Sequence, residues 1–290
     1  MRHLLTFPCA GAALAASLDE AEGRTGILLV TGGSQPRIGS HRMYERLAHA
    51  LASSGFPCFR YDRRGVGDSE GEDPGYRGSG PDIAAAAAAF RRHRPDLERM
   101  IGFGLCDGAT ALALHGADAG LDGLILVNPW LVETEAGEMA PAAIRRHYRD
   151  RLLSKDGWQK IASGSISYKK LFIGVKKILH PSPPADLASE VASALVANPL
   201  PLALILARGD ATAIAAEHEW AGSAFLAPRE RSGPPIHVET DSHTFARPGD
   251  GDALLAACLD ALTRLRTSPS SQSANFDKLS LSGRGAGPVA

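Results

Sequence analysis

The chain has 290 residues, of which 44% are hydrophobic, and this is enough to bury a large core in one domain or two. Its 31 basic residues nearly balance its 32 acidic residues, so the positive charge excess typical of nucleic-acid binding is absent. The four cysteines are widely spaced without a C-x-x-C pair, which argues against a disulfide-rich secreted domain and favours a reducing cytoplasm.

The N-terminus has the outline of a short signal peptide, because residues 1–5 lead into the alanine-rich residues 10–16. Pro8 and Gly11 interrupt this apolar stretch, and its basic region is a single Arg. We therefore expect two short strands around a turn at residues 8–11. No apolar run approaches the roughly 20 residues that a membrane-spanning helix needs, so no transmembrane segment is expected.

Apolar runs and helical patterns then alternate along the chain. Residues 26–31 form a continuous apolar run, which is typical of a strand buried on both faces of a parallel sheet. A helix with Met43, Leu47 and Leu51 on one face follows, and we expect Ser40 to cap it and Gly55 to end it. Further strands are predicted at residues 56–61, 100–103, 124–127, 202–207 and 236–239, with helices at 83–93, 109–114, 212–220 and 253–265. This alternation predicts an α/β fold with a mostly parallel sheet and helices on both faces.

The segment of about residues 131–199 breaks this alternation. It contains helical stretches at 142–153, 158–161 and 187–196 and a basic run at 169–177, so we predict a helical lid insertion. The basic run suits an acidic or amphiphilic substrate or a membrane surface, although solvated helix faces are the simpler interpretation. Residues 267–290 are rich in Ser, Gly and Pro, which predicts a disordered tail after one domain of residues 1–266.

A nucleophile elbow is predicted at Gly104-Leu105-Cys106-Asp107-Gly108, which has the G-x-S-x-G pattern with cysteine in place of serine. The motif follows an apolar strand run and opens a run of helix formers, as the elbow requires. Gly104 and Gly108 supply the small neighbours that its strained backbone needs. A thiol at a helix N-terminus is also favoured as thiolate. On this motif alone, a buried structural cysteine beside two chance glycines remains an alternative.

An acid and a histidine follow Cys106 in the chain order of elbow enzymes. Asp210 and His243 each come just after an apolar strand run, at the sheet edge where open α/β sheets hold their sites. His243 would take the thiol proton of Cys106 or pair with its thiolate, and Asp210 would orient the imidazole.

Alternatives exist for both partners. Asp210 has the position of a cap for the helix predicted at 212–220, and His243 competes with other histidines, among them His41, His115 and His237. Asp241 competes as the acid, but it lies only two residues from His243. A second acid position, after the strand at 124–127, holds Asn128.

An oxyanion hole needs two backbone donors. We expect one from Asp107, which follows the nucleophile, and the other from Gly33 or Ser34 in the loop after the first parallel strand. No metal or cofactor is expected: His41 and His49 lie eight residues apart, without H-E-x-x-H or H-x-x-E-H spacing.

Long blocks of the chain match a known family. The matching stretches are Phe7-Pro8-Cys9-x-Gly11, Gly32-Gly33-Ser34-Gln35-x-Arg37-x-Gly39-Ser40-His41-Arg42, Arg60-Tyr61-Asp62-x-Arg64-Gly65-x-Gly67-Asp68-Ser69-Glu70-Gly71, Gly104-Leu105-Cys106-Asp107 and Arg151-Leu152-Leu153-Ser154-x-x-x-Trp158-x-Lys160-x-x-x-Gly164. On these residues the chain resembles the α/β-hydrolase superfamily over residues 4–265, and within it the exosortase A system-associated hydrolase 1 family. The resemblance implies a bacterial cytoplasmic enzyme linked to exopolysaccharide production and the sorting of proteins with a C-terminal PEP signal. Ser34 departs from it, because a proline is expected there. The elbow cysteine is also similar to that of dienelactone hydrolases, whose lid is minimal.

Together these observations predict a hydrolase or acyltransferase that acts on an ester or thioester of a small molecule through an acyl-cysteine. The alternative is a hydrolase-like scaffold that binds a partner without chemistry. The acyl group, its acceptor and the oligomeric state, a homo-oligomer included, stay open.

Overall fold

The computed structural model describes residues 1–133 and 186–267, in which eight strands form one sheet. The strands are β1 (Arg2–Cys9), β2 (Ala12–Asp19), β3 (Thr25–Val30), β4 (Cys58–Tyr61), β5 (Arg99–Leu105), β6 (Gly123–Val127), β7 (Leu202–Ala207) and β8 (Ile236–Val238). Their order across the sheet is β1-β2-β4-β3-β5-β6-β7-β8. The pairs from β4 to β8 are parallel, whereas β1 and β2 are antiparallel to each other and β2 is antiparallel to β4.

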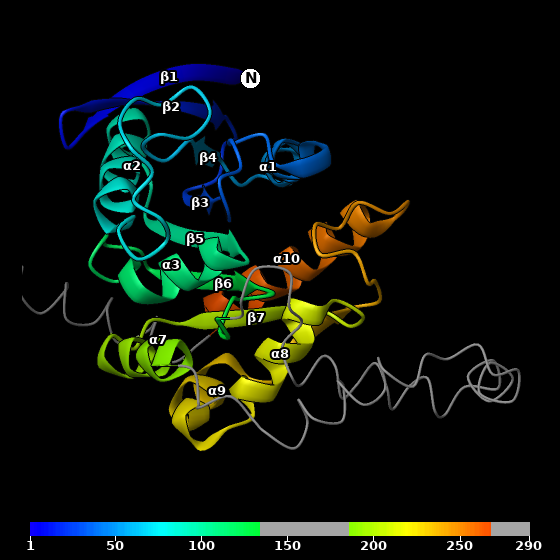
Figure 1. The fold of residues 1–290 in the computed structure, drawn as a ribbon. Helices are drawn as coiled ribbons and strands as arrows, with labels where there is room; N and C mark the ends of the chain where they lie inside the picture. Colours follow the sequence, from blue (N-terminus) through cyan, green and yellow to red (C-terminus); the bar gives the residue numbers. More distant parts are fainter. Residues whose placement is uncertain (134–185, 268–290) are drawn as a thin grey trace, which may run out of the picture.

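Helices cover both faces of this sheet (Figure 1). The described helices are η1 (Ser40–Arg42), α1 (Met43–Ser53), α2 (Gly80–His93), α3 (Asp107–His115), α7 (Asp186–Ala197), α8 (Ala211–Trp220), η2 (Ser223–Phe225), α9 (Leu226–Ser232) and α10 (Asp250–Thr267). On one face α1 contacts α10, and on the other α3 contacts both α2 and α7. The predicted α/β architecture with a mostly parallel sheet and helices on both faces is confirmed.

The core lies along the central strands. Every residue of β6 and β7 is buried, as the continuous apolar runs predicted, because helices cover both faces of the sheet there. Small residues let the helices approach closely: a Cβ on Gly102 of β5 would lie 2.8 Å from a methyl group of Leu112 in α3. Parallel pairing of β5 with β6 and of β6 with β7 then places the carboxyl ends of these strands side by side.

Most of the predicted elements form, with some corrections. The N-terminal hairpin is confirmed, although its turn is Ala10 and Gly11, so that Pro8 and Cys9 belong to β1. The predicted cap at Ser40 is wrong. His41 and Arg42 have positive φ angles, and this kink makes Arg42 the residue that precedes α1, without a side-chain cap. Helix α9 is a short, charged segment that no apolar period announces.

Several sequence-based predictions fall outside the described residues. They are the lid helices at 142–153 and 158–161, the basic run at 169–177 and nearly all of the tail at 267–290. Within the insertion, the helix expected at 187–196 is present as α7. The last predicted helix is also longer than expected, because α10 begins at Asp250 and ends at Thr267. Among the described residues, the helices are too short or too polar to span a membrane.

Candidate active site

Cys106 lies at the sharp turn between β5 and α3. Its φ of 60° and ψ of −128° are a strained conformation for a residue with a side chain. Its N–H donates to the Val127 carbonyl at 3.0 Å, and its carbonyl accepts from the N–H of Ala109 at 3.1 Å. These bonds tie the turn to β6 and to the first turn of α3, and they leave the half-buried thiol at the carboxyl edge of the sheet.

The two elbow glycines are sterically required. A Cβ on Gly104 would lie 2.6 Å from the backbone carbon of Gly108, and a Cβ on Gly108 would lie 2.6 Å from the Val30 carbonyl oxygen. The strand, the helix and the neighbouring strand β3 therefore approach too closely for any side chain. The spacing that indicated an elbow in the sequence corresponds to this packing.

His243 and Asp210 meet at the same edge of the sheet. Nδ1 of His243 lies 2.9 Å from Oδ2 of Asp210, and the Asp210 side chain is only 8% exposed. The same Oδ2 accepts the N–H of Ala213 at 3.0 Å, so Asp210 also caps α8. The two interpretations of Asp210, as helix cap and as partner of the histidine, therefore both hold.

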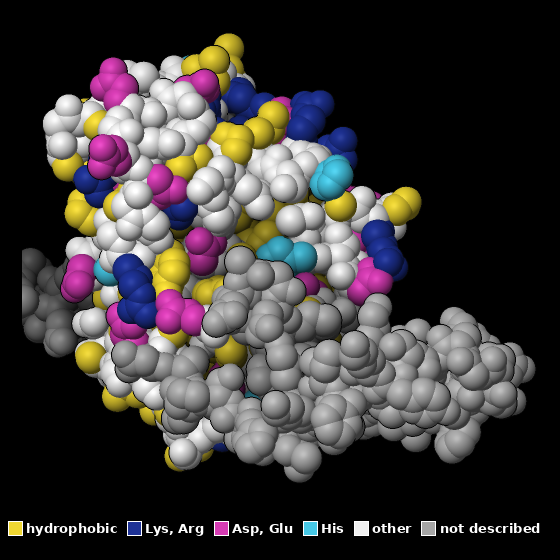
Figure 2. Space-filling view, in the orientation of Figure 1, with side chains coloured by type: hydrophobic (Ala, Val, Ile, Leu, Met, Phe, Trp, Pro, Cys, Tyr) yellow, Lys and Arg dark blue, Asp and Glu magenta, His cyan; other side chains and the backbone are white. Residues whose placement is uncertain are grey.

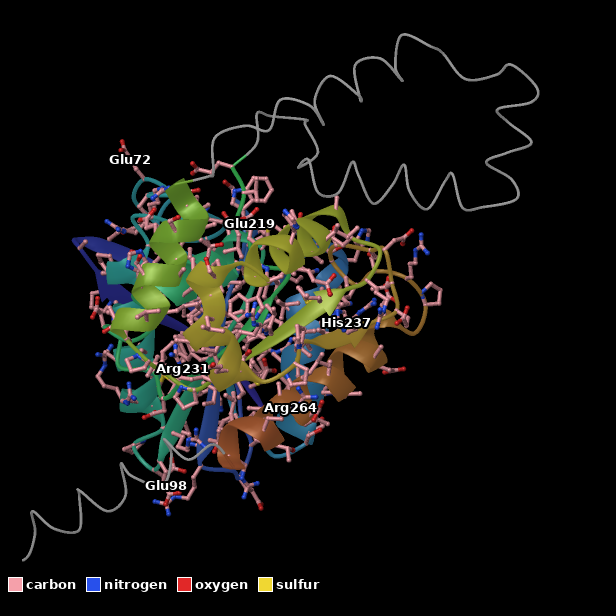
Figure 3. The ribbon with its side chains drawn as sticks, turned by 90° about the horizontal axis from the view of Figure 1, so that it is seen from below. Glu72, Glu98, Glu219, Arg231, His237 and Arg264 are labelled. Atoms are coloured by element: carbon pink, nitrogen blue, oxygen red, sulfur yellow. The ribbon has the colours of Figure 1, made fainter. Side chains whose placement is uncertain are left out.

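The competing candidates have other partners. Asp241 forms an exposed ion pair with Arg247, with 2.5 Å between Oδ1 and Nη2. His115 bonds the carbonyl of Arg77 at 3.0 Å. His237, labelled in Figure 3, lies on β8 with its Nε2 2.9 Å from Oε1 of Glu217.

The electrostatics of His243 join it to both neighbours. Burial lowers the pKa of His243, but hydrogen bonds and electrostatic interactions with Asp210 and Cys106 outweigh burial and raise the pKa to about 10. The imidazole is therefore cationic at neutral pH and contacts the thiol on one side and the carboxylate on the other. This arrangement suits a thiolate–imidazolium pair.

Asn128 fixes the relation between β7 and the histidine loop. It is fully buried after β6 with a φ of 41°, a conformation that asparagine tolerates better than most residues. Its Oδ1 accepts the N–H of Ala207 at 2.8 Å, and its Nδ2 donates to the carbonyl of His243 at 3.4 Å. Asn128, at the second acid position, therefore links the end of β7, which precedes Asp210, to the loop that contains His243.

A cavity of about 280 Å³ opens over the thiol. Its lining residues are Gly32, Gly33, Gln35, Tyr44, Tyr76, Leu105, Cys106, Asp107, Trp130 and His243. Histidine (cyan) and hydrophobic (yellow) side chains lie near the middle of the face seen in Figure 2. A small, mostly apolar hollow with a few polar groups is the usual form of a small-molecule site.

Sequence reasoning missed four of these lining side chains. Gln35, Tyr44, Tyr76 and Trp130 come from loops and from α1, and nothing in their local pattern distinguishes them from core or surface residues. Tyr44 is the most deeply buried. Burial raises its pKa, and its hydroxyl donates to the Val30 carbonyl at 3.3 Å, behind the loop that carries Gly32 and Gly33.

The expected oxyanion loop lies beside the thiol, but one of its donors is already engaged. The N–H of Gly33 donates to Oδ1 of Asp107, the residue whose own backbone N–H is the other expected donor. The side chain of Ser34 is bonded to another residue, because its Oγ donates to Oδ2 of Asp73 at 3.1 Å. The structure therefore brings Gly33 and Asp107 together, and the carboxylate of Asp107 accepts the N–H of Gly33.

A buried ion pair anchors this loop from behind. The Asp62 carboxylate, which is fully buried, accepts both the backbone N–H and the guanidinium of Arg37. The Arg37 carbonyl accepts from Nη1 of Arg60 at 3.0 Å. Gly67 is required here, since a Cβ would lie 2.4 Å from Oδ2 of Asp62. Within the Asp62-x-Arg64-Gly65-x-Gly67-x-Ser69 motif, Asp62 thus holds the loop that contains Gly33 and Arg37.

Comparisons with known proteins agree with this architecture. The family model Hydrolase_4, described as serine aminopeptidase S33, matches residues 27–160, which is less than half of the chain. No curated protein matches. An esterase from Pyrococcus furiosus superposes with a TM-score of 0.58 at 12% identity over 90% of this chain and 91% of its own.

Two further solved structures are similar. An α/β serine hydrolase without lid from Xanthomonas campestris has a TM-score of 0.56 at 18% identity over 92% of this chain and 95% of its own. The thioesterase domain from the curacin biosynthetic pathway has a TM-score of 0.53 at 14% identity over 90% of this chain and 100% of its own. The chain therefore has the α/β-hydrolase fold. The matched family model and the Xanthomonas structure are described as serine enzymes, whereas this chain has Cys106 at the elbow.

Proposed function

We propose that this protein is a hydrolase or acyltransferase that cleaves an ester or thioester through an acyl-cysteine at Cys106, with His243 and Asp210 as its partners. The observation that carries the proposal is the position of one imidazole. His243 contacts both the Asp210 carboxylate and the Cys106 thiol, and the thiol lies on a strained turn at the base of a cavity. Activated nucleophiles are recognised by this chain of contacts.

Acylation follows from the resting charges. The Cys106 thiolate attacks the carbonyl carbon of the substrate and forms a C–S bond, while the carbonyl π electrons move onto oxygen. When the carbonyl re-forms, the bond to the leaving alkoxide or thiolate breaks, and protonated His243 donates its proton to that group. A pKa of about 10 keeps His243 in the proton-donating form that this step needs.

Deacylation needs the opposite form of His243. The thiol and the carboxylate each raise the pKa of His243, and acylation of sulfur removes the contribution of the thiolate. The imidazole then loses its proton more easily and can take a proton from water or another acceptor as that molecule attacks the acyl-cysteine. Asp210 holds Nδ1 throughout.

The chemistry of sulfur supports thioesters as well as esters, because exchange between two thiols is nearly balanced in energy. The small, largely apolar lining of the cavity supports a small-molecule acyl group. Four free cysteines support a reducing, cytoplasmic compartment. The family resemblance noted above supports a link to exopolysaccharide and exosortase systems. We further propose one catalytic domain over residues 1–266 with a lid insertion at 131–199.

The test combines alkylation with a substrate panel. Limiting iodoacetamide should label Cys106 faster at neutral pH than Cys9, Cys58 and Cys258, all three of which are buried. His243→Ala should remove this lead. Activated esters and thioesters should leave an acyl mass on the wild-type protein and none on Cys106→Ala. Esters that react while thioesters do not would remove thioesters from the proposal.

A catalytically silent scaffold is the second candidate, and one observation favours it. The N–H of Gly33, which an oxyanion would need, already donates to Asp107. The scaffold predicts that Cys106 reacts no faster than the buried cysteines even with a small alkylating agent, and that no acyl adduct forms.

A further inference from the structure

The Asp107 carboxylate is bonded to the backbone amide that we propose as a donor to the substrate oxyanion. Its Oδ1 accepts the N–H of Gly33. A Cβ placed on Gly32 would lie 2.7 Å from the same oxygen and 2.4 Å from the Leu105 carbonyl oxygen, so the carboxylate packs directly against this loop. Asp107 also lines the cavity together with Cys106 and His243. The carboxylate therefore belongs to the floor of the site.

Among the described residues, no Lys or Arg forms an ion pair with this carboxylate. The lining of the cavity contains neither Lys nor Arg, and no ion pair to Asp107 is formed within residues 1–133 and 186–267. The positive groups near it are the N-terminus of α3, where it is the first residue, and protonated His243, which is already paired with Asp210. The described lining of the cavity thus presents the carboxylate of Asp107 to an acyl group that enters it.

This charge has a direct consequence for the substrate. A carbonyl oxygen can reach the Gly33 amide only by displacing the carboxylate, and a carboxylate on the acyl group would meet a like charge in a small hollow. A neutral acyl group pays no such repulsion, and a cationic one is attracted. Like charges in a cleft of low dielectric are a strong filter against the wrong ligand.

We propose that Asp107 is a specificity-determining residue, whose carboxylate selects neutral or cationic acyl substrates and rejects acyl groups that carry a negative charge near the carbonyl. The inference rests on the proposed function, because it assumes that the acyl carbon is attacked by Cys106. In this proposal the carbonyl oxygen of the substrate replaces the Asp107 carboxylate as the acceptor of the Gly33 N–H.

Two alkylating agents of similar size test the charge directly. In both, the Cys106 thiolate displaces iodide and forms a C–S bond, but iodoacetate is anionic and iodoacetamide is neutral. We expect wild-type Cys106 to prefer iodoacetamide. Asp107→Asn keeps an acceptor for Gly33 without the charge, so the ratio of the iodoacetate rate to the iodoacetamide rate should rise on the order of tenfold. Asp107→Ala should show the same rise.

Asp260→Asn is the matched control. It also removes one negative charge, but Asp260 lies on α10 in an exposed pair with Arg264 and does not line the cavity. Its ratio should equal that of the wild type. Melting temperatures within about 3 °C of the wild type would show that each variant is folded.

The outcomes separate the two proposals. A ratio that is unchanged in both Asp107 variants, while Cys106 stays reactive, overturns the role of Asp107 and leaves the acyl-cysteine proposal standing. A Cys106 that reacts with neither reagent overturns both. A matched pair of esters, acetyl and succinyl, gives a second readout: Asp107→Asn should raise kcat/KM for the anionic succinyl ester relative to the acetyl ester.

Discussion

Two substitutions of Asp210 separate its charge from its hydrogen bonds to His243 and to the N-terminus of α8. Oδ2 accepts Nδ1 of His243 at 2.9 Å and the N–H of Ala213 at 3.0 Å. The side-chain oxygen of Asn can keep both hydrogen bonds, so Asp210→Asn removes the charge alone. Asp210→Ala removes the charge, the bond to the histidine and the cap of α8.

The magnitude follows from the geometry. Two unit charges about 4 Å apart interact by about 4 kcal/mol at an effective dielectric constant of about 20. Because 32% of the His243 side chain is exposed, solvent screening reduces this to about 2 kcal/mol. We therefore expect the pKa of His243, about 10 in the wild type, to fall by roughly 1.5 units in Asp210→Asn.

The same shift predicts how stability depends on pH. The folded pKa of His243 is raised above its ordinary value of 6.5, so its contribution is fully present below that pH and is lost as the pH rises through about 10. Asp210→Asn should be less stable than the wild type by about 2 kcal/mol at pH 6, and the gap should close as the pH approaches 10. Asp210→Ala should lose about 1 kcal/mol more at every pH, from the missing cap.

Urea denaturation at several pH values and an NMR titration of His243 measure these effects. A gap between wild type and Asp210→Asn that is equal at pH 6 and pH 10 would refute the reasoning. So would a His243 resonance that titrates at the same pH in both proteins, since the Asp210 charge would then not be a cause of the raised pKa.

The remaining predictions concern the frame around the thiol. Gly108→Ala places a Cβ 2.6 Å from the Val30 carbonyl, so we expect a loss of about 2–3 kcal/mol and slower alkylation of the elbow cysteine, whereas Gly251→Ala, with open space around it, should be nearly neutral. Similar melting temperatures for the two glycine variants would contradict this. Asn128→Ala leaves the buried N–H of Ala207 without its acceptor, and urea denaturation should show a loss of about 1–3 kcal/mol. A change below about 0.5 kcal/mol would mean that other contacts hold the β7 end.

Local pattern determined much of this architecture. The runs at 124–127 and 202–207 became β6 and β7 because uninterrupted apolar residues can be satisfied only where both faces of a strand are covered. Cys106, flanked by Gly104 and Gly108 between a strand run and a helix run, marked the elbow. Chain order then led to Asp210 and His243, since the carboxyl ends of parallel strands meet at one edge.

The kink before α1 could not be read in this way. Ser40 has the residue type of a helix cap, but the Arg37–Asp62 pair and Tyr44 hold the preceding loop, and the chain enters the helix through two residues with positive φ angles. Local preference is overruled here by contacts between residues far apart in the sequence.

What the sequence by itself determined is the order of elements and the types of residue at the strand ends, because periodicity and steric requirements are local properties. Only the tertiary structure decided what each side chain contacts. It showed that one Asp210 oxygen serves both a helix and a histidine, and that the Asp107 carboxylate occupies the amide of Gly33. The physical reason is that hydrogen bonds and charges act through distances in space, and residues 33 and 107 become neighbours only when β3 and β5 pair.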